Sequence, residues 1–326
     1  MSNPPPRSRL RVAFAVAAAL LLAFTVAGSC GAWHWLLDLA SHFRGYGLMA
    51  AAVGAVLGVR RPASVAFVCS ALALVGNAWA MLPFWLPAPS VLPAAAAAGP
   101  DAAPVIDLIV ANLHCRNPDR SSAVAYLRDR RPDVAVLLEI DAAWAASLSS
   151  LDEIYPHRIV EAREGTFGIA MLSRWPLTDR QVTTFGGAPY PAIVATVAGP
   201  GRDLRLFAIH PHPPLSAVHD LALRAQLDAV AAAAAAAPHP CIVAGDFNAT
   251  PWSQAYRRFG ARSGLRDTAL GRSVQPTWNA RLPAPRIPID HVFTSPDIAT
   301  LRRAVGPDVG SDHFPVEATL VLPPAE

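Results

Sequence analysis

The sequence predicts an α/β domain with buried sheets over residues 105–323, preceded by a membrane region over residues 1–87. Within the C-terminal two-thirds, short apolar runs rich in β-branched residues alternate with helical patterns, as in layered α/β domains. The whole chain is 53% hydrophobic and only 16% charged, whereas soluble proteins average about 25% charged residues. Very few of those charges fall within residues 12–87. The composition therefore divides the chain into two parts.

The membrane region contains three apolar stretches, at residues 12–32, 45–59 and 63–87. The first and third are long enough to cross a hydrocarbon core of about 30 Å as helices. The second is short and can be extended towards the N-terminus only by including Arg44. A signal peptide is the alternative for the first stretch, but the later stretches favour anchors. We therefore expect about three transmembrane helices and leave open whether the second stretch spans.

Basic residues predict the orientation of these helices. Arg7, Arg9 and Arg11 precede the first stretch, and Arg60 and Arg61 separate the second from the third. Basic clusters of this kind remain on the cytoplasmic side. Three crossings would then place everything after the third stretch outside the cytoplasm.

A Pro/Ala-rich linker at residues 88–104 separates the membrane region from the α/β domain, and its prolines favour a semi-extended spacer. The net charge of +3 gives no strong electrostatic signature of nucleic-acid binding. The four cysteines form no CxxC pair, so a zinc finger is unsupported. A disulfide between Cys115 and Cys241 is an alternative to two buried thiols, and the thiols are favoured.

Polar residues that can bind metal or phosphate recur where the apolar strands end. The expected strands are residues 105–113, 133–140, 168–173, 192–197, 204–210, 241–244, 289–294 and 316–322, with helices at 121–130 and 221–237. The polar residues at or near their ends are Asn112, Glu139, His210, Asp246, Asn248, Asp312 and His313. Each has an ordinary explanation alone, such as an Asx turn at Asp246. Several carboxylates brought together are costly to bury unless a cation compensates them, so their joint occurrence predicts a cation site.

The order of these residues resembles the exonuclease–endonuclease–phosphatase superfamily, which includes deoxyribonucleases, abasic-site endonucleases, neutral sphingomyelinases and inositol-polyphosphate 5-phosphatases. The motifs that carry the resemblance are ANLHCRN, PDVAVLLEID, GIAMLSRWPL, LFAIHPHPP, VAGDFNATPWS, PIDHVFTS and SDHFPV, which together cover roughly residues 104–323. GDFN followed by SDHFPV is the most specific pair. The apolar N-terminal region is similar to that of a membrane-tethered bacterial branch.

The resemblance implies a four-layer α/β/β/α sandwich whose site lies at one end of two facing sheets. It implies metal binding by Asn112, Glu139 and Asp312, with Glu139 the principal carboxylate. The implied catalytic residues are His210, Asp246, Asn248, Asp290 and His313. In these roles Asp246 orients water, Asn248 and the two histidines face the phosphate, and Asp290 orients His313. Mg²⁺ is the implied cofactor, with Mn²⁺ able to substitute, since hard cations prefer oxygen ligands.

Some positions are less well defined by the motifs. His210 is assigned over His212, although the sequence AIHPHPP lacks the Thr that often precedes this histidine. Ser173, Arg224 and Thr277 also fall in family-like positions, with either functional or structural roles. The sequence displays no Arg/Lys-rich loop and no series of aromatic residues for stacking bases.

The expected function is that of a membrane-anchored, Mg²⁺-dependent phosphoesterase that cleaves phosphodiesters or phosphomonoesters by metal-assisted attack of water. Its substrate would be a lipid headgroup, a nucleic acid or a small phosphate ester. The lipid is favoured, because tethering to a bilayer raises the local concentration of lipid. The alternatives are a membrane-tethered nuclease acting on extracytoplasmic DNA or RNA, and a catalytically silent binding protein. The resemblance implies a bacterial inner membrane, multi-pass, and the basic residues with three crossings predict that the catalytic domain lies on the extracytoplasmic side.

Overall fold

The computed structural model describes residues 6–87, 104–238 and 240–324. The chain divides into two compact units, one of Met1–Trp85 with Trp252–Gln254 and one of Leu86–Pro251 with Ala255–Glu326. The linker expected at residues 88–104 lies outside the described residues except for its last position.

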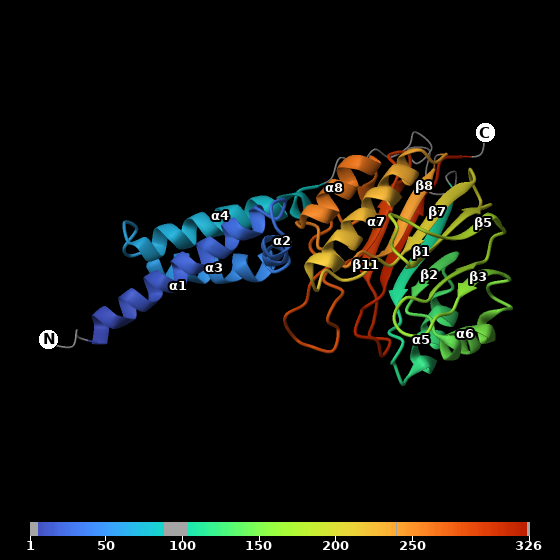
Figure 1. The fold of residues 1–326 in the computed structure, drawn as a ribbon, viewed down its shortest axis with the longest axis horizontal. Helices are drawn as coiled ribbons and strands as arrows, with labels where there is room; N and C mark the ends of the chain where they lie inside the picture. The colour runs from blue at the N-terminus through green and yellow to red at the C-terminus, as the bar shows by residue number, and fades with distance from the viewer. Residues whose placement is uncertain (1–5, 88–103, 239, 325–326) are drawn as a thin grey trace. The chain divides into compact units, whose positions relative to one another are not determined.

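The first unit consists of four helices: α1 (Pro6–Ser29), α2 (Trp35–Ser41), α3 (Arg44–Gly58) and α4 (Val65–Trp85) (Figure 1). Two of them contain segments long and apolar enough to cross a membrane, Ser8–Ser29 and Val65–Trp85. The helix α3 has 15 residues, fewer than the roughly 20 that a perpendicular crossing needs. A third crossing therefore stays a prediction.

Polar side chains connect the apolar helices of this unit. Arg44 donates to Asn77 Oδ1 at 3.3 Å and to Ser29 Oγ at 2.8 Å. Asn77 Nδ2 in turn donates to Thr25 Oγ1 at 3.0 Å. Arg44, the residue that made the second stretch unfavourable as a span, is thus buried at the start of α3. Such hydrogen bonds between helices stabilise a bundle in an apolar surrounding by about 1 kcal/mol each.

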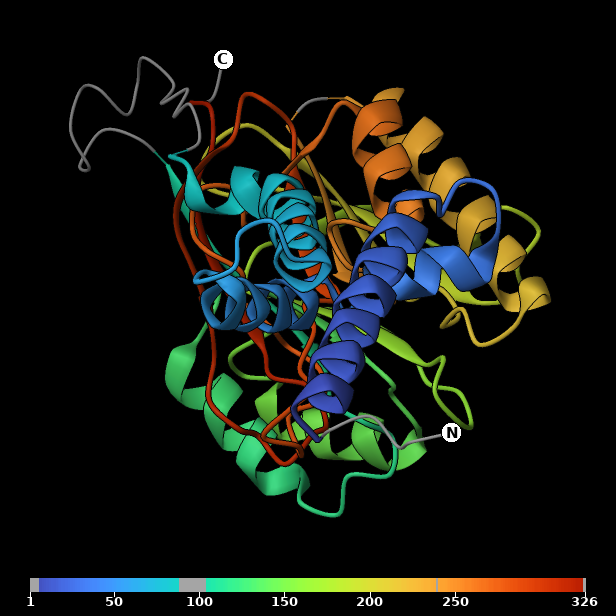
Figure 2. The same cartoon turned by 90° about the vertical axis from the view of Figure 1, so that its left-hand side faces the viewer.

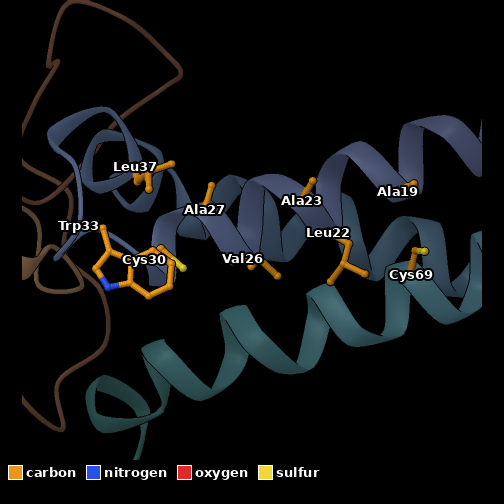
Figure 3. Close-up of a pocket in the computed structure, with 9 residues that line it drawn as sticks. All are labelled: Ala19, Leu22, Ala23, Val26, Ala27, Cys30, Trp33, Leu37 and Cys69. Atoms are coloured by element: carbon orange, nitrogen blue, oxygen red, sulfur yellow. The ribbon is translucent and has the colours of Figure 1, made fainter.

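An apolar groove of about 490 Å³ runs along α1 in this unit. Figure 3 shows Leu22 and Val26 of α1 together with Trp33, Leu37 and Cys69 around it. The side chains that line the groove offer no carboxylate or imidazole.

The second unit contains two six-stranded sheets. Sheet A has the strand order β11-β12-β1-β2-β4-β3, and sheet B has the order β5-β6-β7-β8-β10-β9. The strands of sheet A are β1 (Val105–Asn112), β2 (Val134–Leu138), β3 (His157–Glu161), β4 (Ile169–Ser173), β11 (Ala299–Val305) and β12 (Val316–Val321). Those of sheet B are β5 (Leu177–Thr184), β6 (Pro191–Val197), β7 (Leu204–Ile209), β8 (Cys241–Asp246), β9 (Arg266–Asp267) and β10 (Asp290–Thr294). The helices are α5 (Arg120–Arg130), α6 (Ala142–Leu148), α7 (Ala217–Ala235) and α8 (Gln254–Ser263), with a short 3₁₀ turn at Ser149–Leu151.

Three apolar clusters hold these elements in four layers. The inward faces of both sheets pack against each other, as Val136 of β2 and Leu206 of β7 illustrate. The outer face of sheet A packs on α5 and α6, with Trp144 fully buried in that cluster. The outer face of sheet B packs on α7 and α8 around Phe247 and Phe259. Figures 1 and 2 show the two helix pairs on opposite sides of the sheets. The expected α/β/β/α sandwich is confirmed.

The sequence patterns missed β3, β5, β9 and β11, which lie at sheet edges. The strand β5 reads LTDRQVTT and is exposed at most positions, so it lacks the apolar run that identifies a buried strand. The helix α7 begins at Ala217, four residues before the expected start at residue 221. Ser216 caps it by accepting a hydrogen bond from His219 N at 3.2 Å, a favoured N-cap arrangement. Cys115 and Cys241 are both free and buried, as favoured over a disulfide.

Candidate active site

The strand ends that carry the predicted polar residues meet at one edge of the two sheets. In sheet A, β1 runs parallel to β2, and Asn112 pairs with Leu138 directly before Glu139. In sheet B, β10 runs antiparallel to β8, so that Asp290 pairs with Asp246. The sequence could predict each strand end, whereas the packing of the two sheets brings the ends together.

Asn112 connects a carboxylate of sheet A to one of sheet B. Its Nδ2 lies 3.1 Å from Glu139 Oε1 and 3.2 Å from Asp246 Oδ2. Its Oδ1 accepts from the backbone N–H of His114 at 3.0 Å, which fixes the direction of the amide. All three predicted side chains are buried, Asn112 and Asp246 at 1% exposure and Glu139 at 8%. Two carboxylates therefore face one another across a single amide donor.

His313 is held between Asp246 and a further carboxylate, Asp290. Its Nδ1 lies 2.9 Å from Asp290 Oδ2, and its Nε2 lies 3.7 Å from Asp246 Oδ2. Burial alone would lower the pKa of His313, but the negative charges of Asp290 and Asp246 outweigh it and raise the pKa to about 10. The imidazole is therefore a cation at neutral pH, oriented by Asp290.

His210 and Asn248 complete the surroundings of Asp246. His210 Nε2 lies 3.5 Å from Asp246 Oδ2. Asn248 donates its backbone N–H to Asp246 Oδ1 at 2.8 Å and its Nδ2 to the carbonyl of Pro211 at 2.9 Å. His212, the alternative to His210, is half-buried and bonds to the carbonyl of Pro213. The geometry thus places His210, and not His212, beside the carboxylate.

The residues present fit a divalent cation. Asp246 and Asp290 each place a buried oxygen within 4.8 Å of the other and of His313, whose protonated ring would not itself bind the metal. Oδ1 of Asp290 is buried and has no hydrogen-bond partner among the described residues. An oxygen of Glu139 also lies near Asp246, because Asn112 Nδ2 donates to both carboxylates. Oxygen-rich surroundings of this kind suit Mg²⁺ or Mn²⁺.

Asp312, the third predicted metal residue, lies at the same edge with two neighbours that the sequence interpretation had not assigned. His114 Nδ1 lies 3.2 Å from Asp312 Oδ1 and 3.6 Å from Glu139 Oε2. Trp278 donates its Nε1 to Asp312 Oδ2 at 3.3 Å. His114 belongs to the ANLHCRN motif, but its positive φ of 57°, which turns the chain back to the site, leaves no mark in the sequence.

The three positions that the motifs define less well, Ser173, Arg224 and Thr277, each make a hydrogen bond or an ion pair. Ser173 exchanges hydrogen bonds with Trp175 at the opposite end of β4. Arg224 pairs with Asp220 one helical turn away at 2.7 Å. Thr277 Oγ1 is buried and accepts from the backbone N–H of Asp290 at 3.4 Å, so it supports the residue that orients His313.

The sequence model of the Endonuclease/Exonuclease/phosphatase family matches residues 109–313, which is more than half of the chain. That span contains every site residue described above. The chain belongs to the endonuclease/exonuclease/phosphatase family. Among curated proteins, none is matched significantly.

Solved structures of this family share the fold. The endonuclease/exonuclease/phosphatase from Beutenbergia cavernae DSM 12333 is 26% identical with a TM-score of 0.55, over 68% of this chain and 72% of that one. D. rerio TDP2, solved with a single-strand DNA product, is 20% identical with a TM-score of 0.55, over 66% of this chain and 98% of that one. SmcL is 15% identical with a TM-score of 0.52, over 67% and 99%. The last two support the fold alone.

Members of the endonuclease/exonuclease/phosphatase family are phosphoester hydrolases that depend on divalent metal ions. This chain is an enzyme of that class.

Proposed function

We propose that this chain is a membrane-anchored, Mg²⁺-dependent phosphoesterase that hydrolyses phosphodiesters or phosphomonoesters by attack of water. The observation that carries the proposal is the joining of Glu139 and Asp246 through Asn112, at 3.1 and 3.2 Å. That contact gathers carboxylates from two sheets at one point, next to the cationic His313.

Asp246 is suited to orient the attacking water by accepting a hydrogen bond from it. Burial by itself raises the pKa of its carboxyl, but His313 and His210 outweigh that effect and lower it, so the group is ionised. Its Oδ1 is occupied by the backbone N–H of Asn248, which leaves Oδ2 towards the two histidines. A fixed carboxylate that faces the site can accept a hydrogen bond from a water molecule.

The phosphate is held by groups that surround Asp246. His313 presents its Nε2 towards the same carboxylate, so a phosphoryl oxygen bound there meets a positive charge. Asn248 uses one Nδ2 proton on Pro211 and has a second to donate to the phosphate. Glu139, Asp312 and Asn112 are the residues that we expect to hold Mg²⁺. When bound, the ion supplies charge neutralisation at the phosphoryl and leaving oxygens.

The N-terminal helices provide the proposed anchor. Leu20 of α1 and Val75 and Trp79 of α4 are 65%, 66% and 76% exposed, which is unfavourable in water and typical of lipid-facing helices. With α3 as a third crossing and the basic clusters of the sequence on the cytoplasmic side, the catalytic unit lies on the extracytoplasmic side of a bacterial inner membrane. Surface proteolysis of intact spheroplasts tests this placement, since cleavage of the catalytic unit by external protease is expected and its protection would contradict it.

The experiment for the activity uses the full-length protein in detergent with bis(p-nitrophenyl) phosphate and Mg²⁺. We expect hydrolysis that falls by orders of magnitude in Asp246→Asn. Asp179→Asn is the matched control, because Asp179 lies on the exposed edge strand β5. Equal rates in the wild type and Asp246→Asn would refute the assignment.

A further inference from the structure

Three aromatic rings cluster beside His210. The ring centroid of Phe167 lies 4.0 Å from that of Tyr190 and 5.5 Å from that of His212, and Tyr190 and His212 are 5.5 Å apart. The Phe167 ring also lies 5.6 Å from the ring of His210. We call Phe167, Tyr190 and His212 the aromatic platform. It was invisible in the sequence, because its members come from three separate segments.

The topology places the aromatic platform at the rim of the candidate active site. Phe167 comes just before β4, whose partner strand β2 ends beside Glu139, since Leu138 pairs with Ile169. Tyr190 comes just before β6, which runs antiparallel to β7. The start of β6 therefore lies alongside the end of β7, where His210 follows.

The rings of the platform form a compact cluster. Tyr190 and His212 are inclined to Phe167 by only 28° and 29°, and to each other by 43°. His219, in the first turn of α7, adds a ring whose centroid lies 3.7 Å from that of His212 at 34°. Partly exposed aromatic faces of this kind offer a surface on which another flat ring can stack.

The side chains of the aromatic platform are more exposed than those of the core between the two sheets. Each of its three side chains is only partly buried. The strand residues beneath, Ile169 and Ile209, are fully buried. The platform therefore keeps surface available for a ligand, next to the residues proposed to hold the phosphate.

We propose that the aromatic platform stacks a planar heteroaromatic ring of the substrate, so that the phosphoesters cleaved here are those of nucleotides. The inference rests on the proposed function, because it takes His210, Asp246 and His313 as the phosphate site. Every nucleobase has a π-face, and stacking of bases on aromatic side chains is a general and sequence-tolerant mode of binding.

A lipid headgroup fits this surface less well. Leu215 and Val218, 73% and 72% exposed, would accept acyl chains, but an acyl chain does not require aligned rings.

The test compares two substrates of the full-length protein that share a p-nitrophenolate leaving group. One is the p-nitrophenyl ester of thymidine monophosphate, and the other is methyl p-nitrophenyl phosphate. We expect kcat/KM to be higher for the nucleotide ester. Phe167→Leu and Tyr190→Leu should each lower that value by about tenfold, mainly through KM, without changing hydrolysis of the methyl ester. Trp175→Leu, an aromatic residue at the opposite end of β4, is the matched control and should change neither.

Equal losses on both substrates would make the platform merely structural and overturn the inference, as would equal kcat/KM values for the two esters. Faster cleavage of sphingomyelin or phosphatidylcholine vesicles, lowered by the same variants, would assign the platform to lipids and also overturn it. Quenching of etheno-adenosine monophosphate fluorescence in EDTA separates the two proposals. If the wild type cleaves neither ester but quenches this probe, and Phe167→Leu does not, the proposed function fails while the stacking subsite stands.

Discussion

His313 Nδ1 lies 2.9 Å from Asp290 Oδ2, although the two residues belong to different segments, one before β12 and one at the start of β10. The bond directs the other ring nitrogen towards Asp246. Both partners are buried, at 5% and 1% exposure. The orientation of the imidazole is thus fixed by the fold, and the first prediction follows from it.

Removal of the His313 imidazole should lower kcat more than removal of the charge of Asp290, which orients the ring. We expect His313→Ala to lower kcat by about 10²–10⁴-fold, because the positive charge next to the phosphate is lost. Asp290→Asn should lower kcat by a smaller factor, since the ring remains. Steady-state kinetics of the full-length protein check both values. His157→Ala is the control, because His157 pairs with Ser173 at the opposite end of sheet A. A loss in Asp290→Asn that exceeds that of His313→Ala would contradict this arrangement.

Asn112→Asp should make the stability of the fold depend on metal. The substitution replaces the one donor between Glu139 and Asp246 by a third carboxylate, at a cost on the order of 1–3 kcal/mol. For a unit of this size, each kcal/mol corresponds to about 2–4 °C in Tm. Thermal unfolding in EDTA should show this decrease, and excess Mn²⁺ should restore most of it. A decrease that Mn²⁺ leaves unchanged would count against a cation at this position.

A buried network beneath the site should determine the stability of the second unit. Asp267 accepts hydrogen bonds from His291 at 2.8 Å and Tyr256 at 2.7 Å. Arg303 donates to the backbone carbonyl of Asp290 at 3.1 Å. Breaking a buried charged network costs roughly 3–5 kcal/mol, so denaturant titration of Asp267→Asn should show a loss of that order.

The matched control for this network is Asp228→Asn on the protein surface. Asp228 pairs with Arg258 and Arg262, whose side chains are about half exposed. Surface pairs contribute about 0–1 kcal/mol, so this variant should remain close to the wild type. Similar losses in both variants would show that burial of the network is not the cause.

Glu317 should contribute to stability at neutral pH and less in acid. Burial alone would raise the pKa of its carboxyl, but the hydrogen bond from Tyr126 and the charges of Arg302 and Arg130 outweigh it and hold the pKa below the ordinary 4.5. The folded pKa is thus below the unfolded one, so the stabilisation is present above about pH 4.5 and is lost as the pH falls through the folded value. Urea titrations between pH 3 and 7 should show a flatter pH profile in Glu317→Gln. Glu161→Gln, on the edge strand β3, should retain the profile of the wild type, and an unchanged profile in Glu317→Gln would contradict the prediction.

The sequence could predict the buried strands and the polar residues at their ends. It could not predict the exposed edge strands or every helix. Asp246 was recognisable because an apolar run ends in it, and burial of that run is decided locally by its side chains. The strand β5 was missed because an exposed edge strand carries polar residues on most of its length. The helix α8 was also missed, although Ser253 directly before Gln254 is a favoured N-cap residue type.

The sequence predicted the carboxylates of the candidate site and two of its histidines, His210 and His313. It did not predict the residues that contact them, such as His114. His114 reaches Asp312 only through a left-handed turn, which depends on tertiary contacts. Phe167, Tyr190 and His212 approach one another because two sheets pack together, and each ring alone is an ordinary loop residue. Contacts between distant segments therefore define the part of the site that sequence patterns cannot show.

The central claim is that Glu139, Asp312 and Asn112 hold one divalent cation that the reaction needs. The most direct measurement is hydrolysis of bis(p-nitrophenyl) phosphate by the metal-free full-length protein as Mg²⁺ is added back. We predict no hydrolysis in EDTA, recovery that saturates with Mg²⁺, and a higher Mg²⁺ requirement in Glu139→Gln. Undiminished hydrolysis in EDTA, or the same Mg²⁺ requirement in Glu139→Gln as in the wild type, would contradict it.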